Sequence, residues 1–168
     1  MKNVTAGLFT VLFLLGGCSS DEEQEDLGKP EIEGYVTNQE DDRILVTDPE
    51  PEDANGNGED DYYDALWGSD APDDVEIGQY VEVWVKEGVE TSYPGQADIK
   101  EVEVQSTEAP EGADLSEDEV IRRALEEVEQ DVRIIESVAF DVGEDLWRVS
   151  VITPGRDGSS YELDVEDD

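Results

Sequence analysis

Apolar and polar residues alternate without a break along residues 79–87, QYVEVWVKE. Val81, Val83 and Val85 fall on one face of this segment, and the aromatic and charged residues fall on the other. A period of two residues is typical of a β-strand with one buried face. Four further runs of strand-forming residues, each bounded by turn residues, lie at 32–39, 43–47, 62–68 and 97–105. Five short strands in succession predict an antiparallel sheet or a small barrel over residues 31–105.

The last of these predicted strands contains a change of phase. Ile99 lies out of step with Val102 and Val104. One extra residue in a strand, a β-bulge, shifts the alternation in this way. We therefore expect a bulge near Lys100 or Glu101.

A helical pattern follows a second linker at 106–115, STEAPEGADL. Residues 116–119, SEDE, match a capping box, which marks the start of a helix. Apolar residues then recur at helical spacing, at Val120, Ile121, Ala124, Leu125 and Val128. We expect this helix to end near Gln130.

Three more strands are predicted after the helix, at 132–140, 146–153 and 160–165. Residues 116–168 are therefore expected to form an αβββ module. Because this module is small for independent stability, it is expected to lean on the preceding barrel. The predicted fold class is α+β, with a small antiparallel β-barrel followed by a helix and antiparallel strands.

The N-terminus has the pattern of a signal peptide. Lys2 precedes a short apolar run that ends in Gly16 and Gly17, and the run is shorter than the roughly 20 residues that span a bilayer. Leu15-Gly16-Gly17-Cys18 resembles the bacterial lipobox, in which a peptidase cuts before the cysteine and the thiol receives a diacylglycerol carrying fatty acids such as palmitate. The alternative is a soluble secreted protein with a stray cysteine. Two acyl chains anchor a protein stably, so the chain is expected at the extracytoplasmic face of the cell membrane.

The acidic residues 18–30 are predicted to be a tether between this anchor and the barrel. The whole chain of 168 residues has 48 acidic and 10 basic residues and a net charge of −38. Such a charge repels nucleic acid, so no nucleic-acid partner is expected. The acidic surface is also typical of proteins adapted to salty or alkaline surroundings.

The sequence DANGNGEDDYYD fits the spacing of a calcium-binding loop. Gly58 would permit the sharp turn of that loop. Ca²⁺ takes six to eight oxygen ligands, and the positions that would supply them are Asp53, Asn55, Asn57, Glu59, Asp61 and Asp64. The alternative is a solvated acidic loop with no cofactor, because carboxylates fall into this register easily in so acidic a chain.

Aromatic residues suggest a second candidate site. Tyr80 and Trp84 share a face of one predicted strand, Tyr62, Tyr63 and Trp67 are expected in another, and Tyr93 follows in a turn. Aromatic rows on a barrel can bind a ligand, and a peptide, a glycan or an envelope protein fits Tyr80, Trp84 and Tyr93. The alternative is cross-strand packing.

Catalysis has little support in the sequence. The chain has no histidine, and its single cysteine is the expected lipid acceptor, so no Ser–His or Cys–His pair is available. Carboxylate pairs can hydrolyse glycosides, but they carry no signal among 48 acidic residues. We expect a protein that is not an enzyme.

Residues 32–105 resemble the domain of unknown function 3221, which occurs in short lipoproteins of spore-forming bacteria and their relatives. The stretches that carry the resemblance are EGYVTNQEDDRILVTD, IGQYVEVWVKEGVETSYPGQA and IKEVEV. The resemblance implies a small OB-like β-barrel and brings no activity or ligand with it.

Residues 116–167 are similar to PepSY-type modules through EVIRRALEE and SSYELDVED. That similarity implies a link to the modulation of extracytoplasmic proteases. Together these patterns predict a non-catalytic binding or modulatory lipoprotein. The alternative is a calcium-binding surface protein that uses the 53–64 loop.

Overall fold

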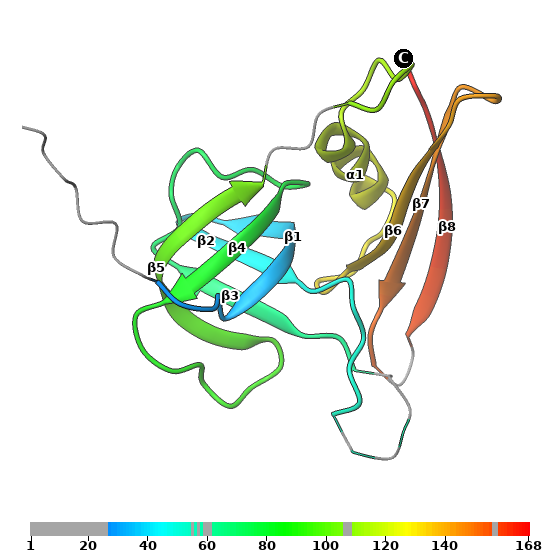
Figure 1. Cartoon of the computed structure of the whole chain (residues 1–168). Helices are drawn as coiled ribbons and strands as arrows, with labels where there is room; N and C mark the ends of the chain where they lie inside the picture. Colours follow the sequence, from blue (N-terminus) through cyan, green and yellow to red (C-terminus); the bar gives the residue numbers. More distant parts are fainter. Residues whose placement is uncertain (1–26, 55, 57, 59–61, 106–108, 156–157) are drawn as a thin grey trace, which may run out of the picture.

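The chain is described here from a computed structural model, which covers residues 27–168 apart from 55, 57, 59–61, 106–108 and 156–157. It forms a closed barrel and, beside it, a helix packed on a three-stranded sheet (Figure 1). The predicted signal peptide, Cys18 and the tether up to residue 26 lie outside the described residues. Within those described residues, no helix is long and apolar enough to span a membrane.

The barrel has five strands in the order β1-β2-β3-β5-β4, and β4 pairs with β1 to close it. The strands are β1 Ile32–Glu40, β2 Arg43–Thr47, β3 Ala65–Ser69, β4 Tyr80–Val85 and β5 Gly95–Gln105. The structure thus confirms the predicted small barrel. Its buried core consists of Ile32, Val36, Ile44, Val46, Leu66, Val75, Val81, Val83 and Ile99.

One pairing in the barrel departs from the antiparallel pattern, because β3 and β5 run parallel. Gly68 allows this approach: a Cβ there would lie 2.5 Å from Cδ1 of Ile99. The predicted bulge in β5 is confirmed, since Trp84 pairs with Glu101 while Val85 pairs with Ile99, which leaves Lys100 as the extra residue.

The third strand begins later than predicted. Tyr62 and Tyr63 lie outside β3, so the prediction of one strand containing them with Trp67 was wrong. Tyr62 instead forms an isolated bridge with Glu52, with backbone N–H to carbonyl distances of 2.7 and 3.1 Å. Tyr62 is therefore paired outside the barrel, and β3 begins only at Ala65.

The module after the barrel contains α1 Glu117–Glu126, β6 Ile134–Asp141, β7 Leu146–Thr153 and β8 Ser159–Glu166. The strands form an antiparallel sheet in the order β6-β7-β8, as the sequence predicted. One face of α1 is buried on this sheet through Val120, Ile121, Ala124 and Leu125. At the start of α1, the backbone N–H and the hydroxyl of Ser116 both donate to the carboxylate of Glu119, at 3.1 and 2.8 Å.

The helix ends at Glu126, earlier than the predicted Gln130. The backbone tightens there, since the N–H groups of Glu127 and Val128 donate to carbonyl oxygens only three residues back, at 3.2 and 3.4 Å. The guanidinium of Arg133 adds hydrogen bonds to the carbonyl oxygens of Leu125 and Val128 at 3.0 and 3.4 Å. The carbonyl of Leu125 lies in the last turn of α1 and that of Val128 just beyond it, and a cation is favourable at this end of a helix.

The same arginine fastens the module to the barrel. Nη2 of Arg133 donates to the carbonyl oxygen of Thr37 in β1 at 2.5 Å, and the hydroxyl of Thr47 in β2 donates to the carbonyl oxygen of Arg133 at 3.2 Å. The hydroxyl of Tyr35 donates to Glu117 at 2.7 Å, and its ring packs against the core of the module. The expectation that the module leans on the barrel is thus met by specific contacts.

Candidate functional site

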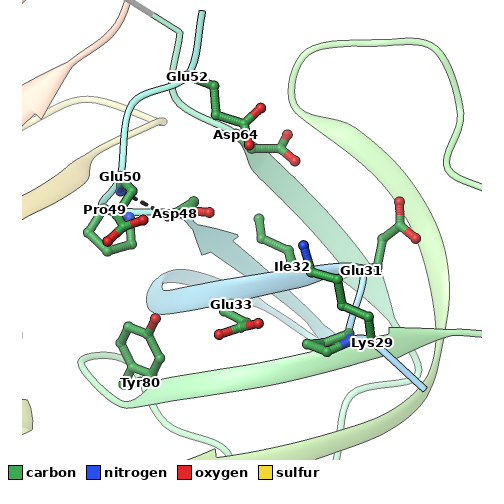
Figure 2. A pocket seen from close by; sticks show the side chains of 11 residues that line it. Lys29, Glu31, Ile32, Glu33, Asp48, Pro49, Glu50, Glu52, Asp64 and Tyr80 are labelled. Atoms are coloured by element: carbon green, nitrogen blue, oxygen red, sulfur yellow. Dashed lines mark hydrogen bonds between the residues drawn. The ribbon is translucent and has the colours of Figure 1, made fainter. Parts of the chain in front are cut away.

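A pocket of about 310 Å³ opens at one end of the barrel (Figure 2). Tyr80, Ile32 and Lys29 contribute to its wall, and Lys29 is the one basic residue among those that line it. Pro30 and Pro49 also line it. The rest of the lining consists of six carboxylates, which belong to Glu31, Glu33, Asp48, Glu50, Glu52 and Asp64.

Three segments of the barrel bring these carboxylates together. Glu31 directly precedes β1 and Glu33 lies at its start. Asp48 and Glu50 follow the end of β2, and Asp64 precedes β3. The backbone N–H of Asp48 donates to the carbonyl oxygen of Asp64 at 3.0 Å, which extends the β2–β3 pairing to the rim. The pocket is therefore a consequence of strand ends that meet at one mouth of the barrel.

Asp48 has the most informative electrostatic environment in the pocket. Burial has the largest effect and raises the pKa of its carboxyl group. The N–H of Glu50 donates to Oδ1 at 2.8 Å and lowers this pKa. The negative charges of Glu50, Glu52 and Asp64 raise it again. The net pKa lies above the usual value, because the ionised form is disfavoured by lost hydration and by like charges. A cationic group in the pocket would relieve that repulsion, so the site is suited to binding a cation or a basic side chain.

The predicted calcium loop adjoins this pocket, and the two share Asp64. Oδ2 of Asp53 accepts a hydrogen bond from the N–H of Gly58 at 2.8 Å, and Gly58 has the positive φ of 84° that its place in the predicted loop requires. Oδ1 of Asp64 accepts from the N–H of Ala65 at 2.9 Å.

The remaining predicted ligands, Asn55, Asn57, Glu59 and Asp61, lie outside the described residues. Among the residues that the structure describes, no group of three carboxylate, histidine or cysteine side chains is placed to hold a metal ion. Calcium binding by the 53–64 loop stays a prediction.

The structure does not bring the three predicted aromatic ligand residues together. The ring of Tyr80 lies edge-on to Tyr35 at a centroid distance of 5.0 Å and borders the acidic pocket. Trp84 is only 8% exposed, and its indole N–H donates to the carbonyl oxygen of Gly28 at 3.0 Å. Tyr93 is 45% exposed and contacts the ring of Tyr62 at 5.7 Å. Tyr80 and Tyr93 therefore each pack against another ring, and for Tyr80 this is the cross-strand alternative, since Tyr35 is its partner on β1. The indole N–H of Trp84 is taken up by a backbone carbonyl.

Sequence reasoning missed the carboxylates from β1 and the segment after β2. Asp48 is followed by Pro49, a pair typical of a turn, and this is the one local signal that marked the position. Nothing in the sequence distinguished Glu31, Glu33 or Glu50 from the other acidic residues.

Residues 33–105 match the family model described as "Protein of unknown function (DUF3221)". The matched range runs from β1 to the end of β5, so it coincides with the barrel and confirms the resemblance of that part. The match does not extend to residues 116–167, whose similarity to PepSY-type modules stays a prediction. Searches of the curated proteins and of the solved structures gave no match to this chain.

Proposed function

We propose that this chain, whose barrel is a DUF3221 domain, is a lipid-anchored, non-catalytic binding protein at the outer face of a cell membrane. The proposed anchor is the lipid on Cys18, and the acidic tether joins it to the barrel. The proposed ligand is a basic segment of an envelope protein or peptide.

The observation that carries the binding role is the acidic pocket. Six carboxylates and one lysine line it, and the raised pKa of Asp48 reflects partial burial among like charges. Such an arrangement lowers the stability of the unliganded protein, because ionised carboxylates repel one another across a partly solvated pocket. Binding of a cationic partner recovers this free energy, which is the expected behaviour of a recognition site.

A comparison of matched variants tests the pocket. The full chain carrying Asp48→Asn and Glu50→Gln has the same net charge as a control carrying Glu101→Gln and Glu103→Gln on the exposed face of β5. Each protein is used to capture partners from envelope extracts of the source cells. We expect the pocket variant to lose the partner that the control retains, and equal capture by both would remove the pocket from the binding site.

A second candidate function is calcium binding by the 53–64 loop, which the hydrogen bond from Gly58 to Asp53 favours. Calorimetry at millimolar Ca²⁺ would compare the full chain with Asp53→Ala and Asp64→Ala variants. We expect a heat of binding that both substitutions abolish. Equal and negligible heats in all three proteins would end the calcium proposal.

The similarity to PepSY-type modules adds a specific role for the C-terminal part, the modulation of an extracytoplasmic protease. Its test is the rate of substrate cleavage by proteases secreted by the same cells, with and without the purified full chain. An unchanged rate over a wide range of protein concentration would contradict this role.

A further inference from the structure

The sheet of the module has a free edge on the side facing away from the barrel (Figure 1). β8 pairs with β7, and within the described residues no strand pairs with the other side of β8. The backbone N–H and carbonyl groups on such an edge are a template for another extended chain.

A groove of about 440 Å³ lies between α1 and this edge. Ala124 from the helix and Leu163 and Val165 from β8 form the apolar part of its lining. Leu163 and Val165 pack against the core of the module but are only half-buried. A strand added beside β8 would place every second side chain over this apolar surface.

The other face of β8 is acidic. Glu162, Asp164 and Glu166 are exposed there and alternate with the inward side chains. On β7, Glu162 faces Ser150 and Glu166 faces Leu146, so neither carboxylate has a basic neighbour across the ladder. Within the described part of the chain, Asp164 has a basic neighbour in Arg148, at 3.9 Å.

These two faces determine what can pair with the edge. A second copy of this chain, pairing β8 with β8, would bring Glu162, Asp164 and Glu166 of both copies close together. Like charges at facing positions of a sheet are destabilising. Lysine or arginine at the outward positions of an added strand would instead face carboxylates, and apolar residues at the inward positions would cover Leu163 and Val165.

We propose that β8 and the groove beside it bind an extended segment of a partner protein in which basic and apolar residues alternate. The segment adds a fourth strand to the sheet, with main-chain hydrogen bonds to β8 and side chains read by the two faces. The inference rests on the proposed binding function and adds to it a partner chemistry and a site separate from the acidic pocket.

The test uses a nine-residue peptide in which lysine and valine alternate, titrated into the full chain in about 0.15 M salt, where the screening length is about 8 Å. The variant Glu162→Lys with Glu166→Lys is compared with Glu101→Lys with Glu103→Lys, which changes the net charge equally on the barrel. We expect the β8 variant to weaken binding about tenfold or more, an effect of about 1.4 kcal/mol or more. The barrel variant should change the dissociation constant by less than about twofold, because β5 belongs to the barrel and β8 is the edge of the sheet that faces away from it (Figure 1). Equal weakening by both variants would show unspecific attraction and overturn the proposal.

Two peptides methylated at alternate backbone amides provide a control that leaves charge unchanged. Successive N–H groups of a strand point to opposite edges, so we expect one methylated peptide to lose binding and the other to retain it. Retention by both would contradict strand addition. Sedimentation of the full chain gives a further check. A dimer whose stability changes in the Glu162→Lys variant would show that β8 binds a second copy of this chain, and it would overturn the proposed partner segment. These outcomes do not depend on lipid at Cys18 or on the pocket variants, so failure here is distinguishable from failure of the proposed function.

Discussion

The barrel closes its hydrogen-bond ladder on itself, since β1 pairs with β2 on one side and with β4 on the other. The sheet of the module instead ends in β6 and β8, each of which has a strand partner on one side within the described residues. The barrel also buries its core with its own strands and loops. The core of the module is instead covered by α1 and, from the barrel, by Tyr35 of β1. The difference indicates that the barrel is the self-sufficient part and that the module depends on it.

Substitution of Trp147 is expected to have the largest effect and tests whether the module can unfold while the barrel stays folded. Trp147 is 2% exposed in the core of the module, where its ring packs against Phe140 at 5.2 Å. We expect Trp147→Ala to destabilise the module by about 3–5 kcal/mol, because a large cavity replaces the indole. Amide hydrogen exchange should then be accelerated in β6–β8 but remain slow in the barrel.

Trp147→Phe is the matched control, since it keeps most of the ring volume and removes the indole N–H. It should cost less than the alanine variant. If Trp147→Ala accelerated exchange equally in all eight strands, the barrel would not be the independent part.

Arg133 tests the connection between the two parts. Its guanidinium donates hydrogen bonds to backbone carbonyl oxygens in α1, in the segment after α1 and in β1. We expect Arg133→Met to destabilise the protein by about 2–3 kcal/mol, because three hydrogen bonds from a charged donor are lost. Urea unfolding is followed by separate probes in the barrel and in the module, and in the variant we expect the two parts to unfold at different urea concentrations. Transitions that still coincide would show that other contacts are enough to couple the unfolding of the two parts.

Asp167 ties the end of β8 back to the start of α1. Its carboxylate accepts from the N–H groups of Asp114 and Leu115 at 2.7 and 2.9 Å and from the indole N–H of Trp147 at 3.0 Å. Burial opposes ionisation, but these hydrogen bonds and the charge of Arg123 outweigh it and lower the pKa of Asp167.

A lowered pKa in the folded state means that the unfolded chain binds the proton more tightly. The stabilisation from Asp167 is therefore present above its usual pKa of about 3.9 and is lost as the pH falls through the lower folded value. We expect acid unfolding to begin in the module, and Asp167→Asn to lower its stability at neutral pH and to flatten its acid dependence. The measurement is thermal unfolding between about pH 2 and 7, and an unchanged acid dependence in the variant would contradict this role.

The pKa of Asp48, at the rim of the barrel, is shifted in the opposite direction from that of Asp167. Because its pKa is raised, the folded barrel binds this proton more tightly than the unfolded chain, and its ionised form at neutral pH is destabilising. Asp48→Asn keeps an acceptor for the N–H of Glu50 and removes the charge. We expect a gain in stability of less than about 1 kcal/mol, since the site is partly solvated. Destabilisation at neutral pH would show that Asp48 has a favourable ionic partner.

Local periodicity was enough to predict most of the elements. The alternation around Val81 and Val83 gave β4, and the phase change at Ile99 gave the bulge at Lys100. The sequence did not indicate the parallel pairing of β3 with β5, because parallel pairing depends on contacts between distant segments. Tyr62 and Tyr63 were assigned to a strand on propensity, which the bridge to Glu52 overrides.

The candidate site was harder to predict for a related reason. Asp64 appeared in the expected calcium ligands, but its neighbours Asp48 and Glu33 come from other strand ends. Their proximity depends on closure of the barrel. Apart from the Pro49 that follows Asp48, no local pattern distinguishes them among 48 acidic residues. The contacts of Arg133 were equally hidden, since its partners are main-chain carbonyls that any residue could supply.

The proposed role of both parts depends on an anchor that places them at the membrane surface. Growth of the producing cells with labelled palmitate, followed by isolation of the full chain and of a Cys18→Ser variant, tests that anchor most directly. We predict label in the full chain, none in the variant, and release of the variant into the medium. Absence of label from the full chain, or a variant that stays with the membrane, would contradict the account.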